Sequence, residues 1–196
     1  GPADQEFLDS EDFKNGKTKL QFIWGIVGGS IDKNYIKPIT DGFNQMMGNG
    51  ILAGYNIDSM KVRVHDGSMH SVDSKPIAFE LAAKEGFREA AKKAGAVLLE
   101  PIMKLEVTTP DEYTGSVIGD LNRRRGLVKG QDVKFNAVIV KAEVPLSEMF
   151  GYVTQLRTIT SGRASSTMEF SHYAEVPRNL SEEVIAKAKG KATGKA

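Results

Sequence analysis

The chain has 196 residues, 40% hydrophobic and 26% charged, a composition typical of a globular protein with one large or two small domains. Its formal net charge of +1 excludes a global electrostatic attraction to nucleic acid or to an anionic membrane, so any contact with RNA has to be local. The lack of cysteine excludes disulfides and thiolate metal sites and favours a reducing, cytoplasmic location. The sequence shows neither a secretory signal nor the roughly 18 apolar residues of a membrane helix.

The N-terminal part of the chain changes from a polar to an apolar sequence at residue 20. Gly1-Pro2 resembles the remnant left by a tag-cleaving protease, and residues 3–19 are polar and aperiodic. We therefore expect a mobile lead-in or loop there. Residues 20–27 form an apolar run of strand length that is closed by Gly28-Gly29, which predicts a buried strand.

Two helices and a strand are predicted next. Apolar residues recur at helical spacing from about Pro38 to a stop at Gly48, and residues 60–64 alternate apolar and polar, as in a strand with one covered face. Residues 76–94 predict a long helix that Gly95 caps. The inward face of this helix is expected to carry Phe79, Ala83, Phe87 and Ala90 or Ala91.

A second domain is expected to begin near residue 97, where the pattern restarts. Residues 101–107 alternate as in a strand. The stretch 109–112 (TPDE) predicts an N-cap, a proline at the first helical position and an acid at the third, so a short helix should run from there to Gly126. Residues 133–144 are extended and long enough for two strands if the chain bends.

The last part of the chain completes the pattern. Pro145 is expected to begin a helix that ends at Gly162 and is followed by a last strand over residues 164–170. The side chains expected to point inward from this helix are Leu146, Met149, Phe150, Val153 and Leu156. Residues 180–196 are expected to form a fraying basic tail. The order β-α-β-β-α-β predicts a ferredoxin-like fold, an antiparallel sheet with two helices on one face.

One short motif suggests a nucleotide site but does not meet its requirements. Gly16-Lys17-Thr18 copies the end of a phosphate-binding loop, which also needs a glycine five positions before Gly16, directly after a strand. Position 11 is Glu11, and a strand rather than a helix is predicted to follow. We interpret the match as coincidence.

Histidine and aspartate are concentrated in residues 64–74 (VHDGSMHSVDS), between the predicted strand and the long helix. The candidate metal ligands or acid–base groups there are His65, Asp66, His70 and Asp73. Their spacing is not that of a metal site, and the third histidine, His172, lies in the other predicted domain. We expect neither a metal nor a catalytic site. Small polar residues between rigid elements suit a loop that either stays idle or contacts a partner.

Three consecutive arginines, Arg123, Arg124 and Arg125, end the short helix of the second domain. Cations at a helix C-terminus complement the helix dipole, which is a purely structural explanation. The three side chains also splay over most of the helix circumference and could grip phosphates. Both interpretations stay open. The predicted strand over residues 138–143 lacks the aromatic residues of an RNA-recognition sheet.

Two long strings strongly resemble the C-terminal domain of bacterial elongation factor G: LLEPIMKLEVTTPDEYTGSVIGDLNRRRG (residues 98–126) and VPLSEMFGYVTQLRTITSGRASSTMEF (residues 144–170). Residues 20–95, with IVGGSIDKNYIKPI and LAGYNIDSMKVRVHDGSMHSVDS, look like the later part of the preceding domain IV. The resemblance implies an α+β chain in which a ribosomal-protein-S5-like domain precedes a ferredoxin-like one. The expected division is 1–19 lead-in, 20–96 partial domain IV, 97–177 C-terminal domain and 178–196 tail.

The resemblance also implies a function. In that family the factor is a GTPase that drives tRNA and mRNA through the ribosome and, with a partner factor, helps to split ribosomes. Because this chain has no phosphate loop, we expect it to bind no cofactor itself and interpret it as a C-terminal fragment of a longer enzyme that uses GTP and Mg²⁺. The expected partners are the decoding site with its tRNA and mRNA and the large-subunit rRNA; a membrane partner is not expected, and the chain should be monomeric.

By the same resemblance, a loop at the tip of domain IV reaches the decoding site, with His70 at the position of the family's tip histidine. This tip loop comprises Asp66, Gly67, Ser68, Met69, His70, Ser71, Val72, Asp73 and Ser74. It has two carboxylates and no Lys or Arg, so we expect a shaped wedge that offers hydrogen bonds from His70 and serine hydroxyls rather than a phosphate grip. The expected phosphate contacts lie elsewhere: Lys61, Arg63, Lys92, Lys93, Arg123, Arg124 and Arg125.

Three alternatives compete with a translocation factor. Ribosome-protection proteins of the tetracycline-resistance type share these two domains, although the segment GSMHSVDS favours elongation factor G. A paralogue devoted to ribosome recycling is not separated from a translocation factor by this sequence. A ferredoxin-like regulatory module, which binds a small ligand or dimerises through its sheet, is the alternative from another class, and it would leave the helix-end arginines unexplained.

Overall fold

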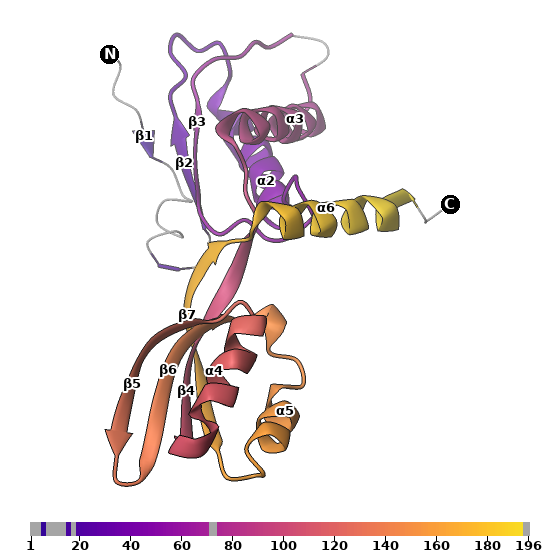
Figure 1. The fold of residues 1–196 in the computed structure, drawn as a ribbon. Coiled ribbons are helices and arrows are strands. Elements are labelled where there is room, and N and C mark those ends of the chain that lie inside the picture. The colour runs from indigo at the N-terminus through magenta and orange to yellow at the C-terminus, as the bar shows by residue number, and fades with distance from the viewer. Residues whose placement is uncertain (1–4, 7–14, 17–18, 71–73, 194–196) are drawn as a thin grey trace. The chain divides into compact units, whose positions relative to one another are not determined.

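The structure is a computed structural model that describes residues 5–6, 15–16, 19–70 and 74–193 (Figure 1). The chain divides into two compact units, Gly1–Val97 with Asn179–Ala196 and Leu98–Arg178. Among the described residues, none of the helices combines the length and the apolar composition needed to cross a membrane. Each unit is built on its own sheet.

The first unit contains a three-stranded sheet in the order β1-β2-β3. Strand β2 (Leu20–Trp24) lies parallel to β3 (Met60–Val64), and β1 (Gln5–Glu6) pairs with β2 antiparallel. The expectation of a lead-in without regular structure is therefore wrong at Gln5–Glu6. Backbone hydrogen bonds to the edge of β2 hold this strand, and such bonds leave no hydrophobic pattern in the sequence.

Two helices cover one face of this sheet (Figure 1). A 3₁₀ turn, η1 (Lys33–Tyr35), leads into α2 (Ile36–Met47), and α3 (Pro76–Ala94) follows β3 and ends at Gly95 in the left-handed conformation with φ 79°. Both helices and the alternating strand are confirmed. The core that they share with the sheet includes Leu20, Phe22, Trp24, Ile39, Phe43, Met46, Phe79, Ala83, Phe87 and Ala91.

The second unit is a four-stranded antiparallel sheet in the order β5-β6-β4-β7. Its elements in chain order are β4 (Leu99–Pro110), η2 (Asp111–Tyr113), α4 (Thr114–Arg123), β5 (Leu127–Lys134), β6 (Ala137–Pro145), η3 (Leu146–Glu148), α5 (Tyr152–Ile159) and β7 (Ser165–Glu175). Because the first and third strands of the unit are central and α4 and α5 cover one face, the ferredoxin-like prediction is confirmed (Figure 1).

The two faces of the second sheet differ in chemistry. The face under the helices buries Leu105, Val107, Val138, Val140 and Val144, which pack against Val117, Leu121 and Leu156 of the helices. The opposite face carries charged pairs across neighbouring strands, such as Lys104 with Glu169 at 3.8 Å. The alternation of apolar and polar residues in these strands therefore sets which face the helices cover.

The predicted helix starts in the second unit need correction. Thr109 caps no helix: it is fully buried in β4, and its hydroxyl donates to the carbonyl of Pro110 at 3.1 Å. The side chains of Phe150 and Val153 are 85% and 58% exposed rather than inward. Gly151 has φ 70°, which interrupts the helical path, so α5 begins afterwards and buries another face.

The predicted fraying tail is also wrong, because residues Arg178–Thr193 form helix α6. The charge of this segment suggested a solvated tail. The segment is nevertheless rich in Ala, Lys and Glu, which are strong helix formers, and its apolar residues Leu180, Val184 and Ile185 recur at helical spacing and are half-buried.

Candidate functional site

Two loops meet at one end of the first sheet. Strands β2 and β3 are parallel, so the loops that follow them, residues 25–32 and 65–75, leave the sheet at the same edge. A hydrogen bond of 2.8 Å from the Gly25 amide to the Val64 carbonyl joins the two segments where the loops begin. The sequence predicted the second loop as a functional element and missed the first one as its neighbour.

The tip loop closes on itself through its last residue. The amide of His70 donates to Oγ of Ser74 at 2.7 Å, and the amide of Ser74 donates back to the carbonyl of His70 at 3.1 Å. The hydroxyl of Tyr35, which precedes α2, donates to the carbonyl of Ser74 at 3.1 Å. The first two bonds close the loop on itself, and the Tyr35 bond ties its end to the helical layer. Ser71, Val72 and Asp73 lie outside the described residues.

The neighbouring loop braces the other side of the tip loop. The amide of Asp32 contacts the sulfur of Met69 at 3.1 Å. A Cβ atom on Gly67 would collide with Cδ1 of Ile31, so a larger residue at position 67 would require the end of the Ile31 side chain to move. Ile31 itself is 6% exposed and belongs to the core of the unit. The sequence signal for this brace is Gly28-Gly29 after a buried strand, which marks a turn at the sheet edge.

The tip loop is largely exposed to solvent between residues 66 and 70. Asp66, Gly67, Ser68, Met69 and His70 are all exposed, and the carboxylate of Asp66 accepts a hydrogen bond from the Gly67 amide at 2.7 Å. Within residues 5–6, 15–16, 19–70 and 74–193, no three His, Cys, Asp or Glu side chains gather as a metal site would require. The loop can offer hydrogen bonds and a defined shape to a partner, but it brings no cation to it.

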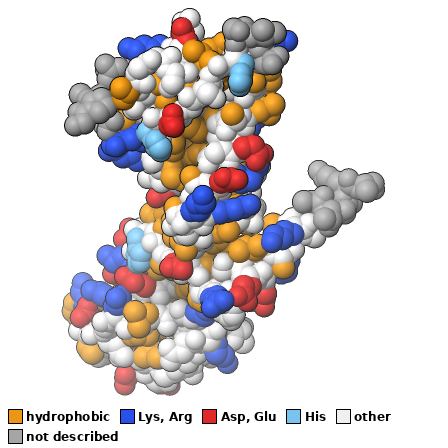
Figure 2. Space-filling view, turned by 90° about the horizontal axis from the view of Figure 1, so that it is seen from above, with side chains coloured by type: hydrophobic (Ala, Val, Ile, Leu, Met, Phe, Trp, Pro, Cys, Tyr) orange, Lys and Arg blue, Asp and Glu red, His pale blue; other side chains and the backbone are white. Residues whose placement is uncertain are grey.

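The first unit does not gather its candidate phosphate contacts around this loop. Lys61 and Arg63 are exposed on β3, whereas Lys92 and Lys93 lie in the last turn of α3. The loop leads into the first turn of that helix at Pro76, so Lys92 and Lys93 lie about 25 Å along the helix axis from the loop end. On the face in Figure 2, Lys and Arg side chains are scattered among Asp and Glu rather than collected in one basic patch.

Two of the three consecutive arginines at the end of α4, Arg124 and Arg125, are held by protein groups. Arg124 is 16% exposed and donates to Asp120 at 3.0 Å and to the carbonyl of Glu148 at 2.6 Å. Arg125 donates to both carboxylate oxygens of Glu100, at 2.8 and 3.1 Å, and to Glu148 at 3.0 Å. The Glu100 contact raises the pKa of Arg125. These contacts give Arg124 and Arg125 a structural role, and their phosphate contacts stay a prediction.

Arg123 keeps more freedom. Its side chain is 70% exposed, although it also contacts Asp120 at 3.0 Å. An ion pair this exposed is weak and can be exchanged for a phosphate. Of the three arginines, Arg123 is the one that the geometry leaves able to reach a ligand.

The backbone explains why the arginines turn inward. Arg125 takes the left-handed conformation with φ 57°, and the amide of Gly126 donates to the carbonyl of Leu121 at 2.8 Å, as in a Schellman C-cap. A Cβ on Gly126 would lie 2.7 Å from the carbonyl oxygen of Leu121, which is too close. The cap therefore requires glycine at position 126, although the left-handed residue is Arg125. The cap rotates Arg125 towards the acidic groups of β4 and η3.

Comparisons with known proteins follow the division into units. Residues 3–95 match the family model "Elongation factor G, domain IV", and residues 97–184 match the model "Elongation factor G C-terminus". The chain belongs to the elongation factor G family. The match to domain IV begins at residue 3, so it includes the segment that carries β1.

Curated relatives agree with this assignment. The chain is 57% identical over 190 residues to elongation factor G of Cytophaga hutchinsonii and 56% identical over 179 residues to that of Amoebophilus asiaticus. These matches cover 97% and 91% of the chain but 27% and 25% of the relatives, so the chain spans about a quarter of their length. A crystal structure of a Thermus thermophilus protein matches with a TM-score of 0.74 and 39% identity, over 88% of this chain and 26% of that one.

Proposed function

We propose that this chain is the ribosome-binding C-terminal part of an elongation factor G, the GTPase that promotes movement of tRNA and mRNA during protein synthesis in the cytoplasm. The tip loop of domain IV acts as a wedge at the decoding site, and the C-terminal domain contacts the large subunit. GTP and Mg²⁺ belong to the longer protein and not to this chain, which acts as a monomer.

The observation that carries the proposal is the braced tip loop. Its end is fixed by the bonds among His70, Ser74 and Tyr35, and its flank rests on Ile31 through Gly67. The described segments that flank residues 71–73 are held by these contacts, so they lose little conformational entropy when the loop enters a narrow site. The side chain of His70 stays exposed on it and can offer ring nitrogens to RNA.

The charge of the loop supports a wedge rather than an electrostatic grip. The described part of the tip loop carries Asp66 and neither Lys nor Arg, so phosphates repel it and counterion release contributes nothing to its binding. Affinity for RNA then depends on cations elsewhere. Arg123, with its exposed guanidinium, and the exposed Lys61 are the candidates that the geometry favours.

A binding experiment tests the ribosome as the partner. The chain is sedimented with purified ribosomes at several salt concentrations, and the variants Arg123→Ala and His70→Ala are compared with it. We expect Arg123→Ala to bind more weakly and with a smaller salt slope, by about one unit of log K against log salt, and His70→Ala to bind almost normally. Equal losses in both variants would contradict the division between attachment and wedge.

A kinetic experiment tests the wedge. In the longer protein that carries this chain, His70→Ala should slow tRNA–mRNA movement, whereas GTP hydrolysis should stay close to normal. His65→Ala is the matched control, because His65 is also exposed but precedes the tip loop. If the two variants move tRNA equally fast, His70 has no special role. The same variants in a ribosome-splitting assay separate a translocation factor from a recycling paralogue.

A further inference from the structure

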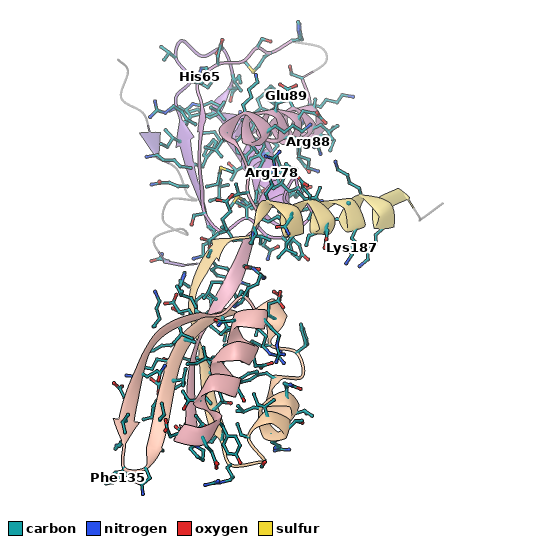
Figure 3. All side chains as sticks on the ribbon, viewed as in Figure 1. His65, Arg88, Glu89, Phe135, Arg178 and Lys187 are labelled. Carbon is teal, nitrogen blue, oxygen red and sulfur yellow. The ribbon has the colours of Figure 1, made fainter. Side chains whose placement is uncertain are left out.

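The sulfur of Met69 connects the tip loop to the segment that precedes α2. Figure 3 shows His65 at the end of β3, where the chain passes towards this loop. The sulfur accepts a hydrogen bond of 3.1 Å from the amide of Asp32. Asp32 also caps η1, because its carboxylate accepts a hydrogen bond of 2.8 Å from the amide of Asn34. Met69 therefore fixes the tip loop to the residue at which the helical layer begins.

This bond differs chemically from the other bond that ties the tip loop to the same layer. The hydroxyl of Tyr35 donates to the carbonyl of Ser74 at 3.1 Å, after residues 71–73 in the chain. A hydroxyl and an amide carbonyl resist mild oxidants, whereas a thioether is oxidised to a sulfoxide. An oxidant can therefore change the Met69 bond and leave the Tyr35 bond intact.

Met69 is also accessible to reagents in solution. The chain has 7 methionines and no cysteine, so thioethers are its only sulfur groups. Met69 is 37% and Met168 44% exposed, whereas Met46, Met47 and Met149 are buried. An oxidant dissolved in water reaches the exposed pair first, and Met69 is the member of that pair whose sulfur joins two segments of the fold.

We propose that Met69 is a reversible oxidation site at which a hydroperoxide releases the tip loop from Asp32. A lone pair of the sulfur attacks one peroxide oxygen, the O–O bond breaks, and the other oxygen leaves as water or an alcohol with the peroxide proton. The thioether loses two electrons and becomes a sulfoxide, and the peroxide gains them. The sulfoxide sulfur carries a partial positive charge, so it no longer accepts the Asp32 amide. The inference concerns the loop itself and goes beyond the proposed function.

Peptide mass spectrometry tests the site. The 196-residue chain is treated with dilute hydrogen peroxide and digested, and the sulfoxide at each methionine is followed with time. We expect Met69 and Met168 to be oxidised at least about 10-fold faster than Met46, Met47 and Met149, since the buried three are reached only when the core opens. Oxidation of Met69 no faster than that of the buried three would overturn the inference.

Hydrogen exchange followed by NMR tests the release. The variant Met168→Leu lacks the other exposed thioether, so peroxide acts on Met69 first. After oxidation, the amide of Asp32 should exchange about threefold faster or more, whereas the amide of Gly50, bonded to the carbonyl of Tyr55 in the same unit, should keep its rate. An unchanged rate at Asp32, or an equal acceleration at both amides, would overturn the release.

Enzymatic reduction tests the reversibility. Two methionine sulfoxide reductases, one for each sulfoxide epimer, are added to the oxidised chain. The exchange rate of the Asp32 amide should then return to its original value. A rate that stays high after the sulfoxide has been reduced would contradict a reversible site.

Met69→Leu is the matched control for the sulfur. Leucine is of similar size but accepts no hydrogen bond, so the Asp32 amide should already exchange at the faster rate and peroxide should not change it further. The Tm should stay within about 2 °C of the unmodified chain, because Met69 lies outside the core cluster of its unit. Slow exchange of the Asp32 amide in Met69→Leu would show that the sulfur does not hold the loop, and would overturn the inference.

Discussion

Nε of Arg124 donates to Oδ2 of Asp120 at 3.0 Å, and the carboxylate that accepts this bond is almost completely buried, with Asp120 4% exposed. The same guanidinium lies 5.1 Å from the centre of the Tyr152 ring and donates to two carbonyls of the segment before α5. One arginine therefore joins α4, η3 and α5. Arg124, which the sequence suggested as a phosphate contact, thus holds the helical layer of its domain together.

Removing the carboxylate should destabilise the C-terminal domain strongly. We expect Asp120→Ala to lower the free energy of unfolding by about 3–5 kcal/mol, because the partly buried Arg124 loses its counter-ion. Arg123→Ala is the control: its side chain is 70% exposed, so its pair with Asp120 should contribute at most about 1 kcal/mol. Urea denaturation of the chain measures both. A loss of less than about 1 kcal/mol for Asp120→Ala would show that Arg124 is held by the carbonyls alone.

The hydroxyl of Tyr152 predicts a pH dependence at alkaline pH. Burial, with a further contribution from the negative charge of Asp120, raises the pKa of Tyr152 from 10.0 to about 12. A raised pKa in the folded state means that its stabilising effect is complete below pH 10 and is lost as the pH rises from 10 to 12. This difference of about two pKa units corresponds to about 2–3 kcal/mol of folding stability that is lost at alkaline pH.

Tyr152→Phe should remove this alkaline loss. Among the described residues the hydroxyl has no hydrogen-bond partner, so its deletion should leave the stability at pH 7 unchanged or raise it by up to about 1 kcal/mol. Thermal unfolding between pH 8 and 12 checks both statements. An unchanged alkaline transition in Tyr152→Phe would assign that transition to other groups.

Two glycines in the helices of domain IV should respond in opposite ways to alanine. A Cβ on Gly42 of α2 would lie 2.6 Å from the backbone oxygen of Glu80 in α3, so Gly42→Ala should force the helices apart and cost about 1–3 kcal/mol. A Cβ on Gly86 would meet nothing within 4 Å, so Gly86→Ala should stabilise α3 by about 0.5–1 kcal/mol. The denaturation midpoints of the two variants measure both effects. If Gly42→Ala raised the midpoint as Gly86→Ala does, the close packing of α2 on α3 would be contradicted.

The tip loop should open when its closing hydroxyl is removed. Ser74→Ala deletes the acceptor of the His70 amide, so exchange of that amide with solvent should quicken about 2-fold to 10-fold while the Tm stays unchanged. Ser68→Ala makes the same chemical change within the loop and serves as the control. Hydrogen exchange followed by NMR reports on the single amide. If both variants exchange at the original rate, the bond does not hold the loop.

Local patterns in the sequence specified most elements of the fold. The helix that Gly95 caps and the β-α-β-β-α-β order followed from periodicity and from glycine positions, because these express the local geometry of helices and strands. Strand β1 and helix α6 were missed for opposite reasons. Strand β1 depends on backbone pairing with a distant partner, whereas α6 has a helical pattern of its own, with Leu180, Val184 and Ile185 on one face, that the density of charged residues concealed.

The family assignment was also within reach of the sequence, since it depends on residue order alone. Only the tertiary structure decided what the charged and exposed residues do. Whether Arg124 faces solvent or Asp120, and whether Ile31 touches Gly67, depends on the direction in which a turn leaves its helix or strand. A few backbone angles set that direction, such as the positive φ values of Arg125 and Phe135. The conformational preferences of arginine and phenylalanine do not predict a positive φ, because the surrounding domain stabilises it.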